Sequence, residues 1–83
     1  MSDKYELFYN LAYELAEFAY GLDEVPVGAV IVKDDTCEVV SSSYNQMKSS
    51  KYSLDHAEIL ALRLAMSRMG NERLNGCSMI STL

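Results

Sequence analysis

The chain has 83 residues, of which 49% are hydrophobic and 23% charged, and its formal net charge at pH 7 is −5. The length limits it to one domain with a small core, and the composition excludes a disordered chain. The sequence has neither a run of about 20 apolar residues nor a basic N-terminus leading into an apolar run, so we expect a cytoplasmic protein without a membrane span. The negative charge repels a phosphate backbone, so a nucleic-acid substrate would need a local basic patch or a partner.

The N-terminal part of the chain predicts a helix over residues 4–20. Polar residues recur at positions 6, 10, 14 and 17, and most of the others are apolar. This spacing predicts one narrow polar stripe and a broad buried face. A row of tyrosines, Tyr5, Tyr9 and Tyr13, is assigned to the packed core on this interpretation. Gly21 is placed where a glycine ends a helix.

A β-hairpin is predicted next. Residues 25–32 read Val-Pro-Val-Gly-Ala-Val-Ile-Val, which predicts a central strand covered on both faces. Pro26 stands at its start, where no ladder donor is needed. Asp34 and Asp35 predict the turn, and residues 37–44 predict the second arm. The polar segment 45–53, which includes Lys48 and Lys51, predicts a loop.

A second helix and a third strand complete the pattern. Residues 56–69 predict the helix, with Asp55 as its N-cap and Gly70 at its end. After a turn at Asn75 and Gly76, residues 77–82 predict the strand. The order helix, hairpin, helix, strand predicts a layered α/β unit.

The residues best suited to chemistry are His56, Ala57 and Glu58, on the first turn of the second helix. Neutral imidazole is a common zinc ligand. A carboxylate two residues further along faces another side of the helix, where it can carry a proton instead of binding the metal. Unpaired N–H groups at a helix N-terminus favour developing negative charge.

Structural roles would also explain these residues when each is taken alone. Asp55 and Glu58 have the spacing of a capping box, which would account for Glu58. A histidine near the start of a helix is often only partly exposed and without function. Asn45 alone is typical of a turn, and Val27 is typical of a strand core.

Taken together, the motifs are more specific. The strand Val-Pro-Val-Gly-Ala-Val-Ile-Val, then Asn45, then His56-Ala57-Glu58-Ile59 eleven residues later, resembles the cytidine deaminase-like superfamily. Within it, the tRNA adenosine deaminase branch is the most similar. The ending Ser81-Thr82-Leu83 adds to the resemblance, since a strand ending in Thr-Leu in that family leads into Glu-Pro-Cys-x-x-Cys. The resemblance implies that residues 1–83 are the N-terminal half of a deaminase-like domain, a truncated three-layer α/β fold.

The resemblance also implies a role for each matching residue. His56 would be a zinc ligand, and Glu58 would carry the proton from zinc-bound water to the base. Asn45 would donate a hydrogen bond from its amide to the base. Ala57 would offer a backbone group in the same pocket, and Val27 would pack on one face of the base.

The chain departs from the family in lacking any Pro-Cys-x-x-Cys. A catalytic zinc site uses three protein ligands plus water, and this chain offers one of the family's three. Cys37 and Cys77 do not easily replace the others, because Cys37 is near the predicted hairpin turn and Cys77 opens the third predicted strand, where the family keeps no ligand. The resemblance implies that an intact enzyme would deaminate adenosine to inosine in tRNA with Zn²⁺. Because this chain offers one ligand, we expect it to be inactive when isolated.

Other interpretations and partners stay open. The chain could be a naturally truncated binding or assembly module without catalysis, or belong to a deaminase that acts on free cytosine or guanine. A thiol switch is disfavoured because nothing beside Cys37 or Cys77 in the sequence would activate either thiol. The expected partners are tRNA or a nucleobase, together with a second copy of the chain or a complementing C-terminal half.

Overall fold

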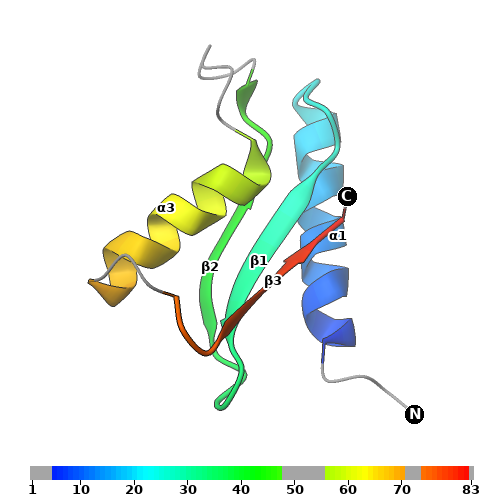
Figure 1. Cartoon of the computed structure of the whole chain (residues 1–83). Helices are drawn as coiled ribbons and strands as arrows, with labels where there is room; N and C mark the ends of the chain where they lie inside the picture. The colour runs from blue at the N-terminus through cyan, green and yellow to red at the C-terminus, as the bar shows by residue number, and fades with distance from the viewer. Residues whose placement is uncertain (1–4, 48–55, 71–73, 83) are drawn as a thin grey trace.

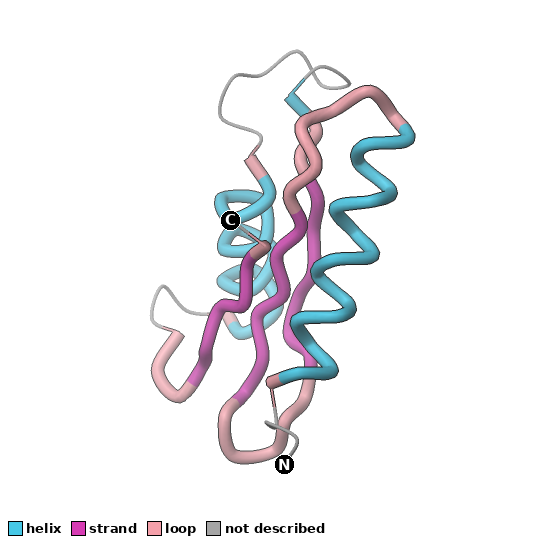
Figure 2. The backbone as a smooth tube through the Cα atoms, turned by 90° about the vertical axis from the view of Figure 1, so that its right-hand side faces the viewer, coloured by secondary structure: helices cyan, strands magenta, loops and turns pink. Residues whose placement is uncertain are grey.

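The structure, a computed structural model, describes residues 5–47, 56–70 and 74–82. Its elements follow in the order α1 (Glu6–Gly21), β1 (Gly28–Lys33), β2 (Val39–Tyr44), α3 (Ala57–Met69) and β3 (Cys77–Ser81). No helix within these described ranges has the length and apolar character needed to cross a membrane. The order of elements confirms the predicted α/β fold. Figure 1 and Figure 2 show the sheet between two layers, with α1 against one face and α3 against the other.

The sheet has three strands in the order β2-β1-β3. β1 runs antiparallel to both neighbours, so that Ala29 lies opposite Ser43 on β2 and Ser81 on β3. The register with β2 shifts between Ile31 and Val32, where the hairpin has an irregularity. This topology makes β1 the central strand, as predicted, although it begins at Gly28, two residues after Pro26.

The side chains of β1 divide the core into two parts. Ala29 and Ile31 pack in a cluster with α3, whereas Val30 and Val32 pack in a cluster with α1. Alternate residues of a strand point to opposite faces, so an uninterrupted apolar run fits a strand that is covered on both sides. The prediction that this strand is buried on both faces is confirmed.

Both helices approach the sheet mainly through small side chains. The buried residues of α1 are Phe8, Ala12, Ala16 and Ala19, and those of α3 are Ala57, Ala61 and Ala65. The packing of α1 against β1 is so close that a Cβ atom added to Gly28 would stand 2.0 Å from the carbonyl oxygen of Ala12. Only a narrow stripe of small residues can face a strand at this distance.

The predicted broad buried face of the first helix is therefore wrong. Tyr9 is 45% exposed and Tyr13 is 54% exposed, with their ring centroids 6.4 Å apart. The tyrosines stand on the solvent side because the alanine stripe occupies the interface with the sheet. Tyr5 alone of this row is half-buried, and it packs against the α1 part of the core.

The ends of the helices follow the prediction in one case and depart from it in the other. Gly70, with φ 70°, ends α3 as predicted. Gly21 is instead the last residue of α1, and the left-handed backbone conformation occurs at Asp23, with φ 64°. Aspartate tolerates this conformation better than most residues, because its short side chain can form local hydrogen bonds.

The predicted turn at Asp34 and Asp35 is confirmed, and it also joins three elements. The hydroxyl groups of Tyr5 and Ser78 both donate hydrogen bonds to Oδ1 of Asp34. The N–H of Asp34 donates to the carbonyl of Gly76 at 2.8 Å. One carboxylate thus connects the start of α1, the hairpin turn and the start of β3.

Candidate functional site

The predicted histidine stands at the N-terminus of α3. His56 is the N-cap, with extended backbone angles (φ −72°, ψ 150°), and its side chain makes no capping hydrogen bond. Its carbonyl accepts the first helical hydrogen bond, from the N–H of Leu60 at 3.0 Å. The residue is exposed. The imidazole is thus presented to solvent from a fixed point of the backbone.

The predicted N-cap, Asp55, is wrong by one residue, since the structure gives that position to His56. Asp55 itself lies outside the described residues. Glu58 is then the second residue of the helix, where a capping box requires the third. The structural explanation of Glu58 as a capping-box residue does not hold. Glu58 is half-buried in the first turn of α3.

Asn45 connects the strand layer to the start of α3. It follows β2 directly and is 2% exposed. Its Oδ1 accepts a buried hydrogen bond of 2.7 Å from the N–H of Ala57. Its own backbone N–H donates to the carbonyl of Val27 at 3.1 Å. Two hydrogen bonds therefore bring Val27, Asn45 and Ala57 together, although they lie far apart in the sequence.

These contacts give Asn45 a structural task. The first N–H groups of a helix have no acceptor within the helix, and Asn45 supplies one for Ala57. Because Oδ1 is the acceptor here, the orientation of the amide is fixed and its –NH₂ group remains as a donor. Val27 is 6% exposed and belongs to the core cluster under α3. Its structural role as a core residue is confirmed.

Two further contacts join neighbouring elements of the fold and were not predicted from the sequence. Thr82 forms a pair of hydrogen bonds with Gly28: its Oγ1 accepts from the Gly28 N–H, and its own N–H donates to the Gly28 carbonyl, both at 3.1 Å. The Ser41 hydroxyl donates to the Ala61 carbonyl at 2.7 Å, which ties β2 to α3. Neither contact has a local sequence signal, because the partners come together only in the folded sheet.

The described residues do not fit a complete zinc site. Nowhere in residues 5–47, 56–70 and 74–82 do three His, Cys, Asp or Glu side chains gather to hold a metal ion. Cys37 is exposed in the hairpin turn. Cys77 contacts Met69, its Sγ 3.8 Å from the Met69 Sδ, at the opposite end of α3 from His56. A helix of this length separates its ends by about 20 Å, so His56 offers one imidazole without these thiols.

Comparison with known families identifies one match across nearly the whole chain. Residues 2–83 match the family described as the cytidine and deoxycytidylate deaminase zinc-binding region. A tRNA-specific adenosine deaminase of Aquifex aeolicus is 38% identical over 78 residues, which cover 94% of this chain and 50% of that protein. The corresponding enzyme of Agrobacterium fabrum is 40% identical over 76 residues, covering 92% of this chain and 49% of that protein.

Solved structures agree with the sequence relatives. A structure from a study of A-to-I editing by tRNA:A34 deaminases superposes with a TM-score of 0.89 at 36% identity, covering 96% of this chain and 60% of that one. Guanine deaminase from Bacillus subtilis superposes with a TM-score of 0.86 at 30% identity, covering 99% of this chain and 50% of that one. The chain spans about half the length of the curated relatives it matches. The predicted three-layer arrangement is thus confirmed by these neighbours.

Proposed function

Because the chain belongs to the cytidine and deoxycytidylate deaminase family, we propose that it supplies the base-binding half of a nucleobase deaminase, with adenosine in tRNA as the substrate. The observation that carries the proposal is the hydrogen-bonded set of Val27, Asn45 and Ala57 at the start of α3. The relatives named as tRNA-specific adenosine deaminases support the choice of substrate. On this proposal residues 1–83 are the N-terminal half of the domain, completed by a C-terminal half or a second copy.

In the proposed site, Asn45 recognises the base. The Ala57 N–H fixes the amide oxygen of Asn45 at 2.7 Å, so the amide –NH₂ donates to an acceptor atom of the base. Ala57 contributes by holding Asn45, since its N–H is already engaged there. Val27 provides apolar contact with the face of the base.

Glu58 moves the proton. Hydrolytic deamination exchanges the amino group for a carbonyl: water adds to the carbon that bears the amine, and ammonia leaves. The water must lose two protons: the ring nitrogen beside that carbon gains one, and the departing amino nitrogen gains the other. A carboxylate positioned beside the water can accept a proton and deliver it to these nitrogens, so Glu58 returns to its starting state after each turnover.

His56 is the proposed metal ligand of this half. Its exposed imidazole at the helix N-terminus can bind zinc through one nitrogen. Since the described residues do not complete a zinc site, we assign no catalytic step to a metal held by this chain alone.

The proposal is tested with Glu58→Gln in the full-length protein that contains this chain. The glutamine keeps the shape of the side chain but cannot carry the proton, so inosine formation in a tRNA transcript should fall by a factor of about 10² to 10⁴. Zinc content should be unchanged. Glu6→Gln is the matched control, since Glu6 also lies in the first turn of a helix but on α1, and is exposed.

A loss of only a few fold would show that Glu58 does not carry the proton. Parallel assays with free guanine and free cytosine separate the substrates. Turnover of guanine without turnover of tRNA would reject the tRNA substrate while keeping the chemistry. A full-length protein that deaminates none of these would support a binding or assembly module in place of an enzyme.

A further inference from the structure

The outer surface of α1 is unusual in combining exposed aromatic and acidic side chains. Tyr13 is 54% exposed and Tyr20 72% exposed. The acidic residues of the helix are Glu6, Glu14 and Glu17, and its sixteen residues include no lysine, arginine or histidine. Clustered exposed apolar surface is a common sign of an interaction site. On α1 every charged side chain of this surface is also negative.

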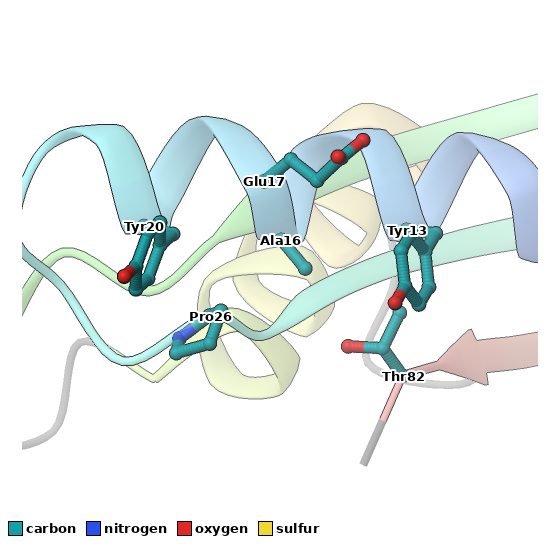
Figure 3. A pocket seen from close by; sticks show the side chains of 6 residues that line it. All are labelled: Tyr13, Ala16, Glu17, Tyr20, Pro26 and Thr82. Atoms are coloured by element: carbon teal, nitrogen blue, oxygen red, sulfur yellow. The ribbon is translucent and has the colours of Figure 1, made fainter.

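A pocket opens within this surface, where α1 meets the start of β1 and the end of β3. It has a volume of about 350 Å³ and is lined by Tyr13, Ala16, Glu17, Tyr20, Pro26 and Thr82. Figure 3 shows the two tyrosine rings at opposite ends, Ala16 and Pro26 between them, and Glu17 projecting from α1 on the side away from Pro26.

This pocket is separate from the candidate deaminase site. Four of its lining residues belong to α1, which covers the sheet face opposite to α3, whereas the candidate site lies at the start of α3. The wall at Thr82 is fixed, because Thr82 Oγ1 accepts the Gly28 N–H at 3.1 Å. The backbone of Gly28 is in turn pressed against α1.

We propose that this pocket binds an arginine side chain from a basic segment of a partner protein. The two tyrosine rings and one carboxylate of the lining match the chemistry of a guanidinium group, which stacks on aromatic rings and pairs with carboxylates. The methylene groups of the arginine rest on Ala16 and Pro26, and its charged head reaches Glu17 at the rim. A volume near the lower end for ligand pockets suits one side chain better than an extended ligand.

Charge complementarity identifies the partner as basic. The chain has a net charge of −5, and α1 contributes only negative side chains to this surface. Such a surface attracts a positively charged segment before contact.

The test uses the 83-residue chain and two short peptides. The first is N-acetyl-Leu-Arg-Leu-amide, and the second contains citrulline, the neutral analogue of arginine, in its place. The arginine peptide should shift the NMR signals of the Tyr13 and Tyr20 rings in a saturable way. The citrulline peptide should bind about five-fold more weakly, because it keeps the shape without the charge.

Substitutions on α1 show which residues bind the arginine peptide. Glu17→Gln should weaken binding of the arginine peptide by about two- to five-fold. Glu14→Gln removes the same charge from the same helix but outside the pocket lining, so it should leave the affinity close to that of the unchanged chain. Tyr20→Leu should weaken binding, whereas Tyr9→Leu, also exposed on α1, should not.

Several outcomes would overturn the proposal. Equal binding of both peptides would indicate an apolar groove, and equal losses in Glu14→Gln and Glu17→Gln would indicate only diffuse charge attraction. Shifts of the Tyr13 and Tyr20 signals with rising protein concentration, without peptide, would assign the surface to a second copy. Thermal unfolding shows whether each variant is folded. If a leucine variant fails to fold, the comparison of Glu14→Gln with Glu17→Gln still tests the proposal.

Discussion

The side-chain oxygen and nitrogen of Asn45 have different tasks in this structure. The oxygen accepts the Ala57 N–H in a buried position, and the –NH₂ group is the proposed donor to a base. Substitutions at Asn45 can therefore separate its role in holding α3 from its proposed role in binding a base. Aspartate keeps an acceptor and loses the donor, whereas alanine loses both.

We predict that Asn45→Ala lowers the free energy of unfolding by about 1–3 kcal/mol, because the buried Ala57 N–H loses its acceptor. Asn45→Asp should cost less than Asn45→Ala, because the carboxylate keeps the acceptor and the helix N-terminus offsets part of the cost of burying its charge. Urea unfolding of the three proteins measures both values. An alanine variant as stable as the unchanged chain would show that this hydrogen bond does not stabilise α3.

At the scale of single residues, the sequence indicated that Asn45 and the start of α3 come together, but it did not give the fine geometry. The interval from Asn45 to His56 indicated residues of one site, and the structure brings Asn45 against Ala57. The sequence did not show that the Ala57 N–H is engaged by Asn45, nor that His56 is the N-cap. Both depend on how the end of β2 meets the start of α3.

At the scale of elements, the hairpin and helices were predictable but the buried side of α1 was not. Nearly every side of that helix carries apolar residues, so periodicity alone cannot choose the one that faces the sheet. Close packing made the choice, since only the stripe of Ala12, Ala16 and Ala19 fits against Gly28 and its neighbours. α3 repeats the pattern with Ala57, Ala61 and Ala65, while Leu62 is 37% exposed.

The contacts of Asp34 lead to a prediction at the same scale. Asp34→Asn should lower the free energy of unfolding by about 1–2 kcal/mol, because a neutral amide oxygen accepts the hydrogen bonds of Tyr5 and Ser78 more weakly than the charged carboxylate does. Asp35→Asn is the matched control in the same turn, and since Asp35 is exposed its effect should be within about 0.5 kcal/mol. Urea unfolding compares the two. Equal effects would mean that Asp34 acts only through its charge in the turn.

At the scale of the whole molecule, the inventory of metal ligands leads to a prediction about zinc. The sequence has one histidine and two cysteines, and Cys77 lies at the far end of α3 from His56. The 83-residue chain should therefore retain well under one equivalent of zinc after gel filtration with a weak chelator, as measured by mass spectrometry. His56→Asn should retain a similar trace.

One equivalent of zinc that is lost in His56→Asn would contradict this prediction. It would also show that two or more chains share ligands around a single ion. Gel filtration at the same protein concentration would then reveal the corresponding oligomer.

The central position of β1 has a consequence for the order of folding. β1 pairs with β2 across a short turn, with Val32 opposite Val39, but its pairing with β3 joins Lys33 to Cys77. The chain segment that the β1–β3 pairing closes is longer, by about three doublings, than the segment that the β1–β2 pairing closes. Its closure therefore costs about 2 kcal/mol more in chain entropy. The hairpin therefore closes first and β3 docks last. During synthesis, one edge of the most apolar strand stays open until β3 emerges, which is the interval when mispairing with other chains is most dangerous.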